Sequence, residues 1–242
     1  MIPHLAPWQW IVGALCAFQI GVAKTGVPGF ATLVVPVMIL TVGDARRSAG
    51  WLLPILCVAD LFAIFYWRRH AAARRLFALA PWVLAGIAAG AAALALDERI
   101  LRPLVGAIIL AMLAAYLWRR FQPDSAIAPH NAAYGIAAGF ATTVANAAGP
   151  VMNLYLLSKR LPKEEFVATG AWFFFFVNLS KLPIYIYYGL FSAASLAFDA
   201  LMIPAVLAGA LAGRSLLHLL PPRVFETVVI ALTAASTLLL FR

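Results

Sequence analysis

The chain has 242 residues, of which 64% are hydrophobic and 11% are charged, and its mean hydropathy is +0.94. This composition excludes an ordinary soluble domain and predicts an all-α, polytopic membrane protein. The net charge of +9 would suggest nucleic-acid binding in a soluble domain, but the basic residues cluster in short loops between apolar segments. Because that placement is typical of membrane topology, we expect no nucleic-acid partner.

Apolar segments that can cross a bilayer follow one another along the chain. About 20 helical residues span the hydrocarbon core. We expect eight segments, at about residues 8–42, 48–67, 76–96, 100–118, 131–157, 166–189, 195–217 and 222–241. The start, MIPHLAPWQW, lacks the basic region and the cleavage site of a secretory signal, so the first segment is expected to remain in the mature protein.

The first and fifth segments are too long for one crossing, and each contains a helix-breaking motif. These motifs are KTGVPG at residues 24–29 and NAAGP at residues 146–150. Each long segment is therefore predicted to be a pair of short helices that meet near the middle of the membrane. Pro28 and Pro150 can open the second helix of each pair, since proline suits the first helical turn. The amides of that turn have no intrahelical partner and form a positive end at which an anion can bind.

The two halves of the chain share an ordered set of residues. Gly21, Pro36, Val37 and Met38 recur as Gly135, Pro150, Val151 and Met152; Trp51 recurs as Trp172; and Pro81, Gly86 and Gly90 recur as Pro204, Gly209 and Gly213. The offset grows from 114 to 121 to 123 without reversing. We infer two homologous transmembrane repeats, residues 1–120 and 131–242, joined by the linker FQPDSAIAPH at residues 121–130.

The basic loops bear on the orientation of the repeats, because such loops stay in the cytoplasm. If the fifth segment is a hairpin, the repeats are inverted and four basic loops share the cytoplasmic side, at residues 67–75, 119–122, 158–165 and 214–223. If that segment crosses once, the repeats are parallel and the last two loops lie outside. We favour hairpins and inverted repeats, although Arg46 and Arg47 would then lie outside.

Polar side chains inside the apolar segments are the candidates for function. A charged residue at the bilayer centre costs about 2.5–3.5 kcal/mol on insertion scales, so such a residue usually has a functional or structural role. The candidates are Lys24, Thr25, Asp60, Thr142, Thr143, Asn146, Asn153, Asn178, Ser180 and Lys181. Glycines at the breaks let a ligand approach the backbone. The predicted substrate site comprises Lys24, Thr25, Gly26, Gly29, Asn146, Gly149, Pro150, Asn153, Asn178 and Lys181.

Several of these residues have alternative roles. Lys24 adds a positive charge to a helix end, but it could also snorkel to the interface or be neutralised by Asp60. Lys181 aligns with Asp60 in the repeats, so a buried Asp60–Lys181 ion pair is weighed equally with substrate contact. Asn178 shares a helical face with Lys181 and could instead bond a neighbouring helix. Asp60 is also a candidate proton carrier.

Other residues are given no role in the site. The aromatic run at residues 172–176 is assigned to packing or lipid contact, and Cys16 and Cys57 are assigned to packing. The four histidines lie in loops or at segment ends, and the sequence contains no HExxH, no nucleophile motif and no Walker motif. We therefore expect no enzymatic activity, no ATP hydrolysis, no cofactor and no metal.

The break residues also carry a family resemblance. At their spacings, they resemble the sulfite exporter TauE/SafE family, also called the toluene sulfonate uptake permeases: Gly21, Lys24, Gly26, Gly29, Asn146, Gly149, Pro150, Asn153, Tyr155 and Leu156. The likeness covers nearly the whole chain, including its length, its two halves and the basic loop after the second helix. The resemblance implies the movement of sulfite, sulfonates or sulfoacetate across the cytoplasmic membrane without ATP hydrolysis. The motif NAAGP stands where a glycine-rich turn is often seen in that family.

The residues indicate an anion as substrate, and the resemblance narrows it to a sulfur oxyanion. We expect a secondary transporter of the cytoplasmic (inner) membrane that holds its substrate between the two broken helices and moves one half against the other. The partners expected are a small anion and the lipid bilayer, and homo-oligomer formation is left open. The alternatives are an anion channel, a carboxylate carrier, and a membrane sensory or assembly subunit whose breaks only pack helices.

Overall fold

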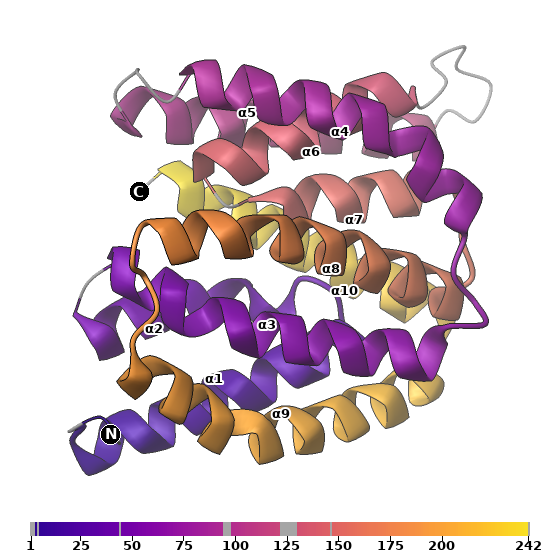
Figure 1. Cartoon of the computed structure of the whole chain (residues 1–242). Coiled ribbons are helices and arrows are strands. Elements are labelled where there is room, and N and C mark those ends of the chain that lie inside the picture. Colours follow the sequence, from indigo (N-terminus) through magenta and orange to yellow (C-terminus); the bar gives the residue numbers. More distant parts are fainter. Residues whose placement is uncertain are drawn as a thin grey trace. The chain divides into compact units, whose positions relative to one another are not determined.

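The protein is helical (Figure 1). The computed structural model describes residues 3, 5–43, 45–93, 98–121, 130–145 and 147–241, and these contain no β-strand. The α-helices are α1 (Pro7–Thr25), α2 (Val34–Val42), α3 (Ala45–Trp67), α4 (Ala73–Ala93), α5 (Glu98–Phe121), α6 (Asn131–Ala145), α7 (Ala148–Ser158), α8 (Lys163–Tyr187), α9 (Ala193–Leu219) and α10 (Pro222–Leu238). Two short 3₁₀ helices are η1 (Phe30–Leu33) and η2 (Leu239–Phe241). Most of the predicted linker, residues 122–129, lies outside the described residues.

Within the described part of the chain, five helices are long and apolar enough to cross a membrane. They lie within α3, α4, α5, α8 and α9. This confirms the predicted all-α, multi-pass membrane protein. The first predicted segment is divided into α1, η1 and α2, and the fifth into α6 and α7. Both divisions fall at the glycine- and proline-containing motifs, where an uninterrupted helix would be costly.

The chain forms two compact units, and each unit takes helices from both halves of the sequence. Unit 1 comprises Met1–Ala71 and Lys163–Phe225, and unit 2 comprises Ala72–Pro162 and Glu226–Arg242. Each of the two repeats inferred from the sequence is therefore shared between the units. The compact units and the sequence repeats therefore divide the chain at different residues.

In unit 1, helices α1 and α9 run parallel and touch backbone to backbone (Figure 1). A Cβ atom on Gly21 would lie 2.2 Å from the Val206 carbonyl oxygen, and one on Gly26 would lie 2.1 Å from that of Gly213. Thr25 completes this contact, since its Oγ1 donates to the Ala210 carbonyl at 2.7 Å. Small residues are what allow membrane helices to approach so closely.

In unit 2, helices α6 and α4 make the same kind of parallel contact. A Cβ atom on Gly139 would lie 2.1 Å from the Val83 carbonyl oxygen, and one on Gly86 would lie 2.2 Å from that of Ile136. Farther along, a Cβ atom on Gly90 would lie 2.8 Å from Cβ of Thr143. The glycine pairs Gly86/Gly90 and Gly209/Gly213, which recur between the two halves of the sequence, therefore both lie at close helix contacts.

Helix directions within each unit follow from contacts at the helix ends. In unit 1, the Trp51 ring meets Phe198 and the Trp67 ring meets His218, so α3 runs parallel to α9. Helix α8 runs antiparallel to α3, since Gly50 near the start of α3 contacts Leu190 just beyond the end of α8.

The two long segments each turn back on themselves. The Gln9 side chain at the start of α1 donates to the Thr41 carbonyl near the end of α2 at 2.7 Å. In unit 2, the Tyr155 hydroxyl near the end of α7 donates to Asn131 at the start of α6, at 3.4 Å. The hairpins predicted for the first and fifth segments are thus seen as helix pairs.

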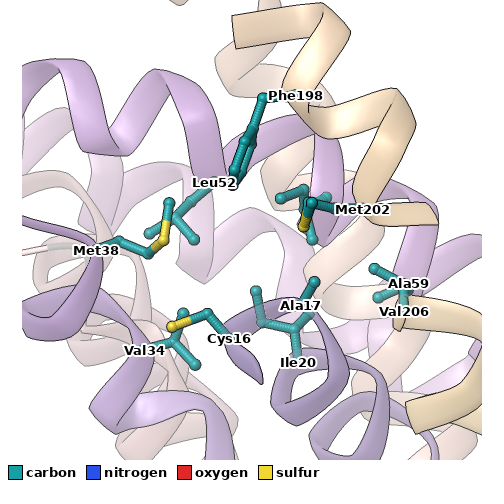
Figure 2. Close-up of a cluster of buried hydrophobic side chains, with 11 residues drawn as sticks. Cys16, Ala17, Ile20, Val34, Met38, Leu52, Ala59, Phe198, Met202 and Val206 are labelled. Atoms are coloured by element: carbon teal, nitrogen blue, oxygen red, sulfur yellow. The ribbon is translucent and has the colours of Figure 1, made fainter. Parts of the chain in front are cut away.

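An apolar cluster joins α1, α2, α3 and α9 in unit 1. Figure 2 shows this cluster, in which Met38 and Phe198 are fully buried. Cys16 belongs to it as a free thiol, and Cys57 is free and half-buried. Cys16 therefore has the packing role that the sequence predicted.

Candidate functional site

The first break leaves α1 at Thr25 and places a turn before the next helix. Gly29 in this turn has a φ of 93°, which is a left-handed conformation that favours glycine. Pro28 lies in the turn, and the 3₁₀ helix η1 begins after it, at Phe30. The expectation that Pro28 opens the second helix was therefore wrong. The left-handed Gly29 caps η1 instead, and η1 leads into α2.

Lys24 forms an ion pair beside this break. Its Nζ lies 2.7 Å from Oδ1 of Asp60 on α3. The Asp60 side chain is fully buried, whereas 13% of the Lys24 side chain is exposed. Of the roles considered for Lys24, the structure therefore shows the ion pair with Asp60. The ammonium group has three donors, so the contact with Asp60 leaves it further donor capacity.

Two residues of α8 complete the surroundings of this ion pair. The Asn178 Nδ2 donates to Oδ2 of Asp60 at 2.8 Å, so both carboxylate oxygens have a polar neighbour. The Phe174 ring lies under the ammonium of Lys24, with Nζ 4.3 Å from the ring centroid. A cation held over an aromatic face is stabilised by the ring quadrupole.

Lys181 belongs to the same charged group. It lies three residues after Asn178 on α8, and it acts electrostatically on both Lys24 and Asp60. We define the charged cluster as Lys24, Asp60, Asn178, Lys181 and Phe174. The cluster contains two lysines and one aspartate. Lysine ammonium groups in an apolar environment attract anions.

The small residues at the end of α1 serve mainly to pack helices. Thr25 is fully buried, and its hydroxyl bonds the carbonyls of Gly21 at 3.0 Å and Ala210 at 2.7 Å. Gly26 is needed for the close contact with Gly213. These two predicted substrate residues therefore hold the end of α1 in place, and Lys24 is the side chain there that remains partly exposed.

The second break lies in unit 2. Helix α7 begins at Ala148, so Pro150 is in its first turn as predicted, and the N-cap residue Ala147 makes no side-chain cap. A Cβ atom on Gly149 would meet no atom within 4 Å, which leaves the first turn open. Asn153 is buried and lies 3.4 Å from the Thr233 hydroxyl on α10. Asn146 lies outside the described residues.

The sequence did not identify two residues that the structure makes notable. Phe174 was assigned with its aromatic neighbours to packing or lipid contact, but it lies against Lys24. Its spacing of four residues from Asn178 could have indicated a shared helical face. The other is Asp199 on α9, a buried carboxyl that was not among the candidates. It lies near the start of the apolar segment predicted at residues 195–217, where an acidic residue can face the membrane interface.

The charged cluster can bind an anion but offers no obvious reaction chemistry. Among the described residues, no group of three or more His, Cys, Asp or Glu side chains could hold a metal ion. The exposed part of Lys24 supplies a charged donor, and the Asp60 carboxylate holds that donor in place. The combination suits reversible binding of a small anion.

Comparison with known proteins gives one match. The family model described as Sulfite exporter TauE/SafE matches residues 13–240, which is nearly the whole chain. No curated protein and no solved structure matches the chain.

Proposed function

The chain belongs to the sulfite exporter TauE/SafE family, and we propose that it is a secondary transporter of small sulfur oxyanions of the sulfite, sulfonate or sulfoacetate type. The family is one of transporters, and the chain has several helices that can cross a membrane. Sulfite and sulfonates are compact anions whose oxygens accept hydrogen bonds from cationic donors.

The observation that carries this proposal is the position of Lys24. Its ammonium is a cation within unit 1, and its side chain is partly exposed although it is paired with the buried Asp60. An ammonium group has three donors, so it can donate to a bound anion and to Asp60 at the same time. Lys181 on α8 adds a second lysine to the same cluster.

The open end of α7 supports a contribution from the second break. The N-cap residue Ala147 makes no side-chain cap, and a Cβ atom on Gly149 would meet no described atom within 4 Å. A helix end of this kind attracts anions through its amides and its dipole. We propose that Gly149, Pro150 and the neighbouring Asn146 contact the substrate during transport, whereas Asn153 holds α7 against α10.

The helix contacts support two inverted repeats. Helices α3 and α8 are counterparts in the repeat alignment, and they run antiparallel within unit 1. Helices α5 and α10 are also counterparts, and they run antiparallel within unit 2, where Tyr116 near the end of α5 bonds Glu226 near the start of α10. Counterparts of opposite direction are what an inverted duplication produces.

The glycine contacts support the same duplication. Gly139 and Thr143 on α6 follow Gly21 and Thr25 on α1 by 118 positions and make equivalent contacts. In α6 this register differs by four residues from the match of Gly21 with Gly135, and the segment between α1 and α2 is longer than the segment between α6 and α7.

The distribution of charge supports an inner-membrane orientation with the basic loops in the cytoplasm. In unit 1, Lys163 donates to the carbonyls of Leu217 at 2.6 Å and Leu220 at 3.0 Å, so two basic segments share one end. In unit 2, burial and the nearby Arg75 and Arg119 lower the pKa of Lys159. Basic groups gathered at one end of each unit are expected on the cytoplasmic side.

Counterflow in proteoliposomes tests the proposed function. Vesicles loaded with unlabelled sulfite should accumulate labelled sulfite, and taurine-type sulfonates or sulfoacetate added outside should compete. Competition by acetate alone would favour the carboxylate carrier, and flux without counterflow would favour the channel. If no sulfur anion is transported and none raises the unfolding temperature of the purified protein, the proposal fails and the sensory or assembly alternative gains support.

A further inference from the structure

Asp199 is a second buried carboxyl group of unit 1, separate from the charged cluster. It lies on α9 and is 6% exposed, and neither of its side-chain oxygens has a hydrogen-bond partner. Asp60, in contrast, is paired with Lys24 and bonded by Asn178. The two buried carboxyl groups of unit 1 thus have opposite environments.

The surroundings of Asp199 are apolar. Ser195, Met202 and Val206 share its helical face, and all three are buried. Met202 and Val206 belong to the apolar cluster in Figure 2. The Ser195 hydroxyl is already engaged, since it bonds the backbone of Ser192 in the cap of α9. The carboxyl group therefore enters the core without a polar contact from its own helix.

The neighbouring helices supply no counter-charge either. Helices α1 and α3 pack against α9. Their titratable groups with described side chains are Cys16, Lys24, Arg47, Cys57, Asp60 and Tyr66. None of these forms a hydrogen bond with Asp199 or acts on its charge, and Arg47 is exposed. An ionised carboxylate in such a place would be strongly disfavoured.

The contact between α3 and α9 shows where Asp199 lies along the helices relative to the charged cluster. Trp51 of α3 meets Phe198, the residue before Asp199. Asp60 lies nine residues farther along α3 than Trp51, or about 13 Å at the helical rise. Asp199 therefore lies between the level of the cluster and the end of unit 1 at which Leu190 and Ser192 are found.

We propose that Asp199 is the proton-binding residue that couples anion transport to a proton gradient. Water at one membrane face gives a proton to the carboxylate, the neutral acid remains stable in the apolar core, and the proton leaves to water at the other face when the conformation changes. One proton moved with one monovalent anion carries no net charge. This inference rests on the proposed transport function and adds its driving ion. Ionisable residues in transmembrane helices commonly serve as proton relays.

Infrared spectroscopy of the purified protein tests the bound proton without any transport. The wild type should show a carbonyl band of a protonated carboxyl group that disappears as the pH is raised. This band should be absent from Asp199→Asn and retained by the matched control Asp60→Asn. A wild-type spectrum without the band, or a band that survives in Asp199→Asn, would overturn the proposal.

Transport in proteoliposomes tests the coupling. Asp199→Asn should lose the acceleration of net sulfite flux by a proton gradient, by about tenfold or more, and keep counterflow at equal pH within about twofold. Asp199→Glu should keep the gradient response, which covers the case that the asparagine variant does not fold. A wild-type response in Asp199→Asn would overturn the coupling role. If the wild type moves no sulfur anion, the proposed function fails, and the infrared band alone decides whether Asp199 binds a proton.

Discussion

The Lys24 Nζ lies 2.7 Å from Oδ1 of Asp60, and of these two side chains only the lysine is partly exposed. The carboxylate is fully buried, and the lysine side chain is 13% exposed. The aspartate therefore depends on the lysine for its stability, while the lysine is free to take a second partner. This asymmetry lets one ion pair serve both the fold and the binding of an anion.

Removal of one partner of this pair should cost more than removal of both. Lys24→Met leaves a buried carboxylate without its counter-charge, so we expect a loss of about 3–5 kcal/mol in stability. The double variant Lys24→Met with Asp60→Asn should recover most of that loss. Thermal unfolding in detergent would measure both, and a double variant no more stable than Lys24→Met would contradict a mutual dependence.

The same variants separate folding from transport. The double variant should be folded yet unable to transport sulfite, because the exposed cation is gone. Lys24→Arg should restore part of the activity, since its charge is spread over a larger planar group. Counterflow with the folded proteins would measure the difference. Wild-type counterflow by the double variant would exclude Lys24 from the site.

Phe174 should contribute more to sulfite affinity than its aromatic neighbours on α8. Phe174→Leu keeps the apolar volume but removes the ring below the Lys24 ammonium, a contact worth about 0.5–2 kcal/mol. We expect sulfite affinity to fall several-fold with little change in expression. The matched control is Phe176→Leu, because Phe176 lies on the same helix and is 56% exposed. Equal effects of the two substitutions would argue against a specific role of Phe174.

Substitution of a glycine at a close helix contact should prevent folding, whereas substitution of a glycine with no neighbouring atoms should not. Gly209→Val places side-chain atoms where a Cβ already lies 2.0 Å from the Phe18 carbonyl oxygen, so α1 and α9 must separate. Gly86→Val should act similarly on α4 and α6. Both variants should give little folded protein in size-exclusion chromatography. Gly149→Ala meets no atom within 4 Å and should fold normally. Normal folding of Gly209→Val would contradict the parallel helix contact.

Cysteine labelling can test the inverted topology. Single cysteines at Ala72, Lys163 and Ser192, in a chain without Cys16 and Cys57, should react from defined sides of the membrane. We expect positions 72 and 163 to label from the cytoplasm and position 192 from outside. An even number of crossings then separates 72 from 163. Labelling of 72 and 163 from opposite sides would support parallel repeats and remove the basis for the inverted arrangement.

Much of the fold could be predicted because the bilayer restricts it. Hydropathy predicted a helical membrane protein, of which five described helices are long and apolar enough to cross a membrane, and the glycine- and proline-containing motifs located both breaks. The packing partners could not be predicted, since the contact of α1 with α9 joins residues far apart in the sequence, and segment hydropathy carries no information about which helix lies next to which.

The candidate site was predicted in its residues but not in its pairing. Lys24, Asp60 and Asn178 were identified as candidates because polar side chains inside apolar membrane segments are costly and usually have a role. Whether Asp60 would face Lys24 or Lys181 depended on the packing of α3 between α1 and α8, which the sequence did not determine. Phe174 and Asp199 were missed, because an aromatic residue among aromatics and an acid near a helix start have common structural explanations.

The contact of α1 with α9 also governs how the protein can be made. The Thr25 hydroxyl bonds the carbonyl of a residue 185 positions later in the chain. At ribosomal speeds of about 5–20 residues per second, synthesis of that stretch takes on the order of 10–40 seconds. During that time the glycine face of α1 has no partner, and the polar hydroxyl of Thr25 can bond only within its own helix. Helix α1 must therefore remain in the bilayer, or beside the insertion machinery, until α9 has been synthesised.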